Sequence, residues 1–264
     1  MSSELRILIL GDVIGRPGMR AVVSGLAALR RTHRADLTIV NGENADDGFG
    51  ISPEIAEQLF KAGADVVTSG NHIWQHESIE QVLAGEKPVL RPVNYPKGCP
   101  GQGIAGFVVR NTPVAVVNLQ GRRRMADIDC PFRKMRDLCK KELSKTVITI
   151  VDFHAEAAEE KEALALMLDG KVSLVYGTHT HIQTSDERIF PKGTAFITDI
   201  GATGPEDSVI GFDPRVSIQR SVTLVPHKNS VVDAPALMQG LIVRVSSETG
   251  KAVSIERIRE VSVV

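Results

Sequence analysis

The sequence of 264 residues contains few cysteines, few aromatic residues and almost no net charge. Its three cysteines, Cys99, Cys130 and Cys139, are odd in number and lack CxxC spacing, which argues against a disulfide framework or a structural zinc site. With 31 basic and 32 acidic residues, the chain has no overall field to hold a nucleic-acid backbone, and 4% aromatic residues disfavour extended stacking on bases. We therefore expect no extended nucleic-acid surface.

Long apolar segments are also missing. No stretch approaches the roughly 20 apolar residues of a membrane-spanning helix, and the N-terminus lacks the cleavage pattern of a signal peptide. We therefore expect a soluble, cytoplasmic protein, which fits the small number of cysteines. The sequence does not decide between a monomer and a homo-oligomer.

Short Val/Ile/Leu-rich runs alternate with helical patterns through most of the chain. This alternation predicts a layered α/β fold, which we place in one domain over residues 1–264. Alternating apolar residues at 104–109 and 114–119 flank a turn and predict a hairpin, so the sheet should be mixed. The late strands indicate two packed sheets with helices outside. We expect helices at 19–31, 53–62, 79–83, 132–143 and 157–168, and late strands at 195–198, 241–245 and 255–261.

Two segments carry further expectations. The charged residues 159–162 should form the solvent-facing side of the helix at 157–168. Residues 201–235 are rich in Gly, Pro, Asp and Ser and have little periodicity, which predicts a long functional loop.

Five of the apolar runs end at residues that can bind metals. Such runs are typical of buried parallel strands, and ligands of open α/β sheets bind beyond the carboxyl ends of these strands. In an extended backbone, the two histidines of the segment 177–181 would point to the same side. The runs therefore predict that these residues converge at one edge: Asp12, Glu43, Asn44, Asn71, His72, His154, His179 and His181.

Without His72, this set still holds too many ligands for one zinc ion. Carboxylate, amide and imidazole groups without thiolate favour Fe, Mn or Zn, and two divalent ions about 3.5–4 Å apart, bridged by one carboxylate, would use all seven residues. Two carboxylates and a bridging hydroxide would leave the site positively charged, as phosphate binding requires. The predicted chemistry is hydrolysis of a phosphoester by in-line attack of hydroxide.

Each motif taken alone has a simpler explanation. Residues 41–44 and 70–72 could be ordinary turns, and a lone pair of histidines near a strand end could be held by hydrogen bonds only. Gly11, Gly15 and Gly18 suggest a nucleotide loop, but they lack the G-x-G-x-x-G spacing, which argues against a dinucleotide-binding oxidoreductase.

The order of the five motifs resembles the calcineurin-like metallophosphoesterase superfamily. Within it, residues 11–15 (GDVIG), 41–45 (NGENA) and 152–156 (DFHAE) are similar to the bacterial subgroup of 2',3'-cyclic-nucleotide 2'-phosphodiesterases. The resemblance implies a four-layer α/β/β/α sandwich. It departs from the superfamily at Ile14, where a histidine ligand is usual, and at Glu43, where the bridging residue is usually aspartate.

The resemblance also implies the ligands of each metal. Asn44 would supply the oxygen ligand in place of the missing histidine, and Glu43 would bridge the two ions. The implied sets are Asp12, Glu43, Asn44 and His181 for one ion, and Glu43, Asn71, His154 and His179 for the other.

Other residues are candidates for supporting roles. His72, next to Asn71, would be the general acid that protonates the leaving alkoxide, and the alternative is a hydrogen-bonded histidine packed beside Trp74. Asp152 and Glu156 could orient ligand imidazoles, or could serve the start of the following helix.

Substrate binding is the least specified part of the sequence. Arg122 and Arg123 could grip phosphate or stack on a base, or could be solvated surface residues. The loops 121–129 and 201–214 are candidates for setting substrate preference. We expect these residues to lie outside the site: His33, His76 and His227.

The leading hypothesis is a dinuclear metal-dependent phosphodiesterase that acts on small phosphoesters, with 2',3'-cyclic nucleotides implied by the resemblance. A phosphomonoesterase or nuclease could use the same site. A metal-binding or nucleotide-binding regulatory protein with little turnover is the alternative of a different class, although it would not need a proton donor at His72.

Overall fold

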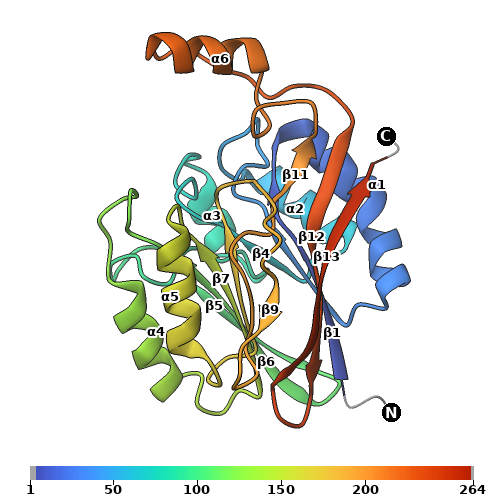
Figure 1. Cartoon of the computed structure of the whole chain (residues 1–264), viewed down its shortest axis with the longest axis vertical. Helices are drawn as coiled ribbons and strands as arrows, with labels where there is room; N and C mark the ends of the chain where they lie inside the picture. The colour runs from blue at the N-terminus through green and yellow to red at the C-terminus, as the bar shows by residue number, and fades with distance from the viewer. Residues whose placement is uncertain (1–3, 263–264) are drawn as a thin grey trace.

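The computed structural model of the protein describes residues 4–262 and has four layers (Figure 1). Two sheets pack face to face, and helices cover the outer face of each sheet. The expected four-layer α/β/β/α sandwich with two mixed sheets is confirmed. The first sheet is covered by α1 (Gly15–His33), α2 (Pro53–Ala62) and α3 (Ile79–Leu83), and the second by α4 (Pro131–Lys140) and α5 (Ala158–Leu168).

The first sheet combines parallel and antiparallel strands. Its strands are β1 (Glu4–Leu10), β2 (Asp12–Val13), β3 (Leu37–Asn41), β4 (Val66–Thr68), β11 (Ala202–Pro205), β12 (Ala236–Ser246) and β13 (Ala252–Val261). They follow the order β2-β11-β12-β1-β3-β4, with β13 paired to β12. The strands β1, β3 and β4 are parallel, so their carboxyl ends lie at the same edge.

The second sheet is built in the same way. Its strands are β5 (Ile104–Val109), β6 (Thr112–Gln120), β7 (Ile148–His154), β8 (Leu174–Thr178), β9 (Arg188–Ile189) and β10 (Ala195–Ile197), in the order β5-β6-β7-β8-β10-β9. The expected hairpin is the antiparallel pair β5 and β6. The strands β6, β7, β8 and β10 are parallel, which brings the ends of β7 and β8 side by side.

Alternation along the strands explains the layers. In β1, Ile7 and Ile9 pack between the two sheets, whereas Leu8 and Leu10 pack under the helices of the first sheet. In β7, Ile150 faces the space between the sheets and Val151 faces α5. Because side chains alternate along a strand, apolar runs without polar interruptions supply both faces of a sheet that is covered on both sides.

The sequence located the first five helices to within a few residues. The helix expected at 19–31 is longer, from Gly15 to His33, and that at 53–62 has the expected bounds. The helix at 79–83 also has the expected bounds. The helix expected at 132–143 spans Pro131–Lys140, and that expected at 157–168 spans Ala158–Leu168. Within residues 4–262, every helix is too short or too polar to cross a lipid bilayer.

The expectation that residues 159–162 all face solvent was wrong. Glu160 and Lys161 are 5% and 1% exposed. Lys161 Nζ donates to Asp199 Oδ2 at 2.8 Å, and Glu160 accepts hydrogen bonds from the backbone N–H groups of Arg122 and Arg123. A charged residue can occupy a helix face turned to the core when a partner on another element balances it. No local pattern in the sequence indicates such a partner.

The segment 201–235 is more ordered than expected. It contains β11 and a further helix, α6 (Pro214–Thr223), whose residues are all at least partly exposed. Because no face of α6 is buried, the sequence has no apolar periodicity there to indicate a helix. In Figure 1, α6 stands apart from both helical layers, at the top of the view.

Replacing Lys161 by methionine should destabilise the fold strongly. The apolar stem of the side chain is kept, but the carboxylate of Asp199, which is 0% exposed, loses its cation. We expect the free energy of unfolding, measured by urea titration, to fall by about 3–5 kcal/mol. Lys140→Met, at an exposed position of α4, is the control and should change it by about 0.5 kcal/mol or less. Equal small effects of both substitutions would contradict a structural role for the buried pair.

Candidate metal centre

The structure brings together all the residues that follow the five apolar runs. Residues after β1, β3 and β4 come from the first sheet, and residues at the ends of β7 and β8 come from the second. They meet where the carboxyl edges of the two sheets adjoin. The members of this cluster are Asp12, Glu43, Asn44, Asn71, His72, His154, His179 and His181, joined by contacts of 2.7–3.9 Å.

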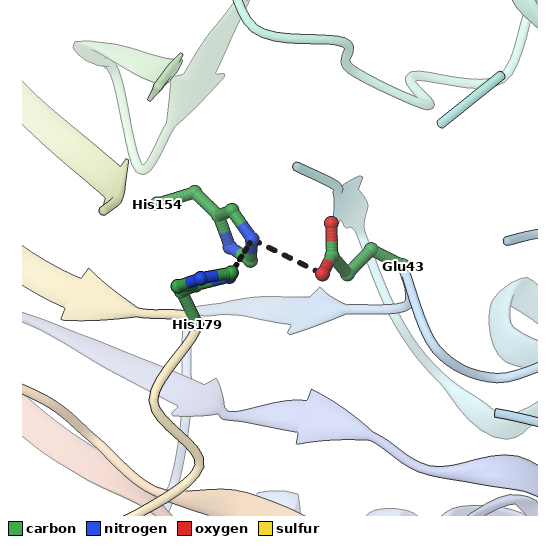
Figure 2. A group of neighbouring side chains, drawn as sticks. All are labelled: Glu43, His154 and His179. Atoms are coloured by element: carbon green, nitrogen blue, oxygen red, sulfur yellow. Dashed lines mark hydrogen bonds and ion pairs between the residues drawn. The ribbon is translucent and has the colours of Figure 1, made fainter. Parts of the chain in front are cut away.

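His154 is the centre of one half of the cluster (Figure 2). Its Nε2 atom lies 3.0 Å from Glu43 Oε1, 3.0 Å from Asn71 Oδ1 and 3.0 Å from His179 Nδ1. One ring nitrogen cannot satisfy three such neighbours, since it carries at most one proton. Ligand atoms about 2.1 Å from a shared ion lie roughly 3.0–3.4 Å from one another, so this spacing fits a cation among them.

Asp12 marks the other half of the cluster. Its side chain is fully buried, and Oδ1 has no hydrogen-bond partner among the described residues. This oxygen lies 3.9 Å from His181 Nε2 and 3.9 Å from His154 Nδ1. Asn44 Nδ2 donates to the same His181 nitrogen at 3.0 Å. A buried carboxylate oxygen without a partner is costly, and a cation beside it would remove that cost.

The pKa values of the carboxyl groups and imidazoles in the cluster are shifted by burial and by their charged neighbours. Burial raises the pKa of Asp12. Burial would also raise the pKa of Glu43, but His154 and His72 hold it well below its usual range. Burial by itself lowers the pKa of His154, yet the carboxylates of Glu43, Asp12 and Asp152 together outweigh burial and raise the pKa to about 9. Burial and the neighbouring His154 lower the pKa of His179 to about 3. The two carboxylates therefore need positive charge between them.

A hydrogen-bonded chain fixes the orientation of His154. Thr178 Oγ1 donates to Asp152 Oδ1 at 2.7 Å, so His154 Nδ1 donates to Thr178 Oγ1 at 2.9 Å. This arrangement leaves Nε2 as the nitrogen directed at the cluster. Imidazoles that bind metals are usually oriented in this way, by a hydrogen bond from the other ring nitrogen. Asp152 also accepts from Thr68 Oγ1 at 2.5 Å, and burial raises its pKa to about 6. The sequence indicated Asp152 but not Thr178, because a threonine at a strand end carries no distinguishing signal.

The backbone around the two last histidines differs from the expectation. Strand β8 ends at Thr178, and His179 and His181 have φ values of 97° and 64°, in the left-handed region. Their rings reach different halves of the cluster and do not point to one place as an extended strand would require. Between them, Thr180 donates from its N–H and its hydroxyl to Asp199 Oδ2. The buried pair of Lys161 and Asp199 therefore anchors this strained loop.

His72 lies on the cavity side of the cluster. Its Nδ1 atom is 2.7 Å from Asn44 Oδ1 and 3.3 Å from Glu43 Oε1, which leaves Nε2 as the nitrogen available to a ligand. Its ring stands edge-on to Phe49, with 5.1 Å between centroids, whereas Trp74 packs against Tyr95. Glu156 Oε2, the other acidic residue suggested by the sequence, lies 3.2 Å from His179 Nε2.

A cavity of about 820 Å³ opens above the cluster. Its floor includes Glu43, Asn44, His72, His179 and His181. One wall is aromatic and aliphatic, and the other is formed by α6 and the segment after it. These wall residues are Phe49, Val209, Ile210, Phe212, Ser217, Arg220, Ser221, His227, Lys228 and Asn229. The expectation that His227 lies outside the site was therefore wrong, because α6 carries this distant segment over the cavity.

Arg122 and Arg123 lie elsewhere. They border a separate cavity of about 320 Å³ with Phe132 and Glu159, and they do not line the cavity above the cluster. Arg123 forms an ion pair with Glu159 at 2.8 Å. The loop 201–214, in contrast, contributes Val209, Ile210 and Phe212 to the main cavity.

Comparisons with known proteins agree along almost the whole chain. A family model described as YmdB-like protein matches residues 8–258. A 2',3'-cyclic-nucleotide 2'-phosphodiesterase of Bacillus subtilis (strain 168) is 42% identical over 254 residues, which cover 96% of each chain. Among solved structures, a hypothetical protein from Thermus thermophilus is 38% identical with a TM-score of 0.91, covering 98% of this chain and 100% of its own. A novel phosphatase of Mycoplasma pneumoniae is 34% identical with a TM-score of 0.94, covering 99% and 95%.

Two aspartates of the cluster region should respond in opposite ways to removal of their charge. In chelator-treated protein, Asp12→Asn should raise the free energy of unfolding by roughly 1–2 kcal/mol, because a buried charge with an unpartnered oxygen is removed. Asp152→Asn should lower it by about 1–3 kcal/mol, since every oxygen of this carboxylate accepts a hydrogen bond.

The measurement is urea unfolding of both variants with and without Mn(II). The wild type should gain more stability from the metal than Asp12→Asn does. If Asp12→Asn destabilised the chelated protein as much as Asp152→Asn, the cluster would not be organised around a cation.

Proposed function

This chain belongs to the YmdB-like protein family, and from that membership we propose that it is a dinuclear metal-dependent phosphodiesterase that converts 2',3'-cyclic nucleotides to 3'-nucleotides. The observation that carries this proposal is the unpartnered oxygen of Asp12, buried in a cluster with Glu43 and three imidazoles, of which Glu43, His179 and His181 line the cavity. Such a donor set suits divalent ions of the borderline type. The relative from Bacillus subtilis, which bears that activity in its name, supports the substrate class.

The proposed ligands divide the cluster into two halves that share Glu43. In this proposal His154 and His179 hold an ion on the side where their nitrogens are 3.0 Å apart, and Asp12 and His181 hold one on the other side. The full sets are Asp12, Glu43, Asn44 and His181, and Glu43, Asn71, His154 and His179. When bound, such ions lower the pKa of water to near 7 and stabilise the charge that develops on a phosphoryl group.

His72 is the proposed general acid. Hydrolysis of the cyclic diester by water forms a new P–O bond and breaks the bond to the 2'-oxygen, which then needs a proton. His72 Nε2 is the group we assign to donate it, because Nδ1 is already engaged with Asn44 and the ring borders the cavity. A positioned histidine contributes about 10²–10⁴-fold in such a step.

Asn44 and Glu43 favour the protonated form of His72. A histidine that acts as a general acid does so from the imidazolium form, in which both ring nitrogens carry protons. His72 Nδ1 lies 2.7 Å from Asn44 Oδ1 and 3.3 Å from Glu43 Oε1, so two acceptors face the proton on this nitrogen. The proton on Nε2 is the one that the leaving oxygen receives, which leaves His72 as the neutral imidazole.

Several finer assignments belong to the same proposal. We assign Fe or Mn as the native metals, with Zn also compatible with the donor set, and the cytoplasm as the compartment. A homo-oligomer is compatible with this proposal and is not required by it. The second candidate function is phosphomonoester hydrolysis at the same cluster, which the relative described as a novel phosphatase favours.

The decisive assay is hydrolysis of 2',3'-cyclic AMP by protein loaded with Mn(II) or Fe(II), with the product isomer identified by chromatography. We expect metal-dependent release of 3'-AMP, and loss of that activity in His154→Ala, because the nitrogen of the central ligand is removed. 3'-AMP and p-nitrophenyl phosphate, assayed in parallel, report phosphomonoesterase activity. Absence of turnover with two metals bound would contradict the proposal and favour a binding role.

His72→Ala tests the proton donor directly. The substitution removes the proton for the leaving 2'-oxygen but none of the seven proposed metal ligands. We expect two bound metals, measured by elemental analysis, with kcat for 2',3'-cyclic AMP reduced about 10²-fold. Normal kcat in His72→Ala with full metal content would exclude His72 as the general acid.

A further inference from the structure

The cavity has a cationic wall that the reaction at the floor does not use. This wall belongs to residues 213–230, here called the arm, which include α6 and the segment after it. The arm contains three cationic residues, Arg215, Arg220 and Lys228, and one carboxylate, Asp213. Asp213 is engaged as the N-cap of α6, where it accepts from the N–H groups of Arg215 and Val216. The arm therefore carries a net positive charge beside the cavity, although the chain as a whole has a net charge of -1.

Both ends of the arm are fixed to the body of the protein. The N–H of Asp213 donates to the carbonyl of Ser230 at 3.0 Å, and Phe212 forms a bridge with Val231. Gly48 allows these two side chains to pack tightly, because a Cβ there would lie 2.8 Å from Val231 Cγ2 and 3.2 Å from Phe212 Cε1. The helix between these ends buries none of its residues. The position of α6 above the cavity is therefore set by the contacts at the two ends of the arm, because the helix has no buried apolar face.

The cavity side of the arm is polar and includes two cations. Ser217, Arg220 and Ser221 lie on one face of α6, as their three- and four-residue spacing requires, and all three line the cavity. Lys228 lines it from the following segment. Among residues 4–262, no carboxylate lies within ion-pair distance of Arg220 or Lys228. These cations therefore remain available to an anion in the cavity.

An aromatic wall connects the floor to the arm. Phe49 contacts His72 at 5.1 Å and Phe212 at 5.5 Å between ring centroids, and Phe212 immediately precedes the arm. Phe49 is 45% exposed although it is large and apolar. A nucleoside with its reacting phosphate at His72 can rest its base or sugar on these rings, since aromatic faces bind bases of any sequence. The far end of such a ligand would then meet the arm.

We propose that Arg220 and Lys228 bind a second phosphate, esterified to the 5'-oxygen, so that the preferred substrates are 2',3'-cyclic nucleotides with a 5'-phosphate ester. This inference rests on the proposed function, because it assumes that a 2',3'-cyclic phosphate reacts at the floor. The 5'-carbon lies at the opposite end of the ribose from the 2'- and 3'-oxygens, so a phosphate on it points away from the floor. Arginine and lysine are the residues that bind phosphate by charge-assisted hydrogen bonds.

The test compares three substrates with Mn(II)-loaded protein: adenosine 2',3'-cyclic phosphate, its 5'-phosphorylated form, and the dinucleotide ApA ending in a 2',3'-cyclic phosphate. We expect kcat/KM to be about tenfold higher for the 5'-esters than for the unsubstituted compound. The double variant Arg220→Gln, Lys228→Gln should reduce this ratio to about one. Arg215→Gln, on the same helix but away from the cavity lining, is the matched control and should keep the ratio. Preference for the monoester or for the dinucleotide distinguishes a free nucleotide from the end of a short RNA.

A binding measurement separates the arm from the chemistry at the floor. By calorimetry, adenosine 3',5'-bisphosphate should bind the wild type about tenfold more tightly than 3'-AMP does, and the double variant should bind the two equally. Equal kcat/KM for all three substrates together with equal binding would overturn the inference and leave the proposed function intact. Absence of turnover with every substrate would contradict the proposed function, and the binding difference would still decide whether the arm holds a second phosphate.

Discussion

The burial of two carboxylates, Asp12 and Glu43, in one cluster is the constraint on which the site depends. Both side chains are 0% exposed, and one oxygen of Asp12 has no hydrogen-bond partner in the described part of the chain. Buried negative charge of this kind is tolerated only when positive charge is placed beside it. His154 supplies part of that charge in the metal-free protein, and divalent ions supply it in the proposed enzyme. The same electrostatic requirement therefore explains the protonation of the histidines and the chemistry we propose.

The packing of the two sheets brings the carboxylates and the histidines together. Glu43 and Asn71 follow strands of the first sheet, whereas His154 and His179 follow strands of the second, and the contacts between them cross the boundary of the sheets. Ions shared by these residues would join the two sheets at their carboxyl edges. The supporting groups are buried for the same reason: Thr178 and Asp152 fix one imidazole, and Asp199 with Lys161 fixes the strained loop that carries two others.

The arm over the cavity follows a different principle. The floor is rigid because its residues end buried strands, but α6 buries no residue and is held only where its two ends meet the body. A segment of this kind can carry charge and hydrogen-bond donors close to a ligand without constraining the core. The structure thus separates reactivity, which resides at the sheet edges, from recognition, which we assign to the arm and the aromatic wall beside it.

Within residues 4–262, the sequence by itself determined five of the six helices and all strands except the short β2, β9 and β11, together with the layered fold and the residues of the cluster. It could do so because apolar runs with period two or period 3.6 report burial, and because each run ended at a residue able to bind metal. Only the tertiary structure decided what depends on partners distant in the chain. Lys161 is buried because Asp199 lies opposite, the rings of His179 and His181 diverge because their backbone is left-handed, and His227 reaches the cavity because α6 lies above it. Ion pairs between distant residues and a helix without a buried face leave no periodic pattern in the sequence. Only the folded structure therefore reveals them.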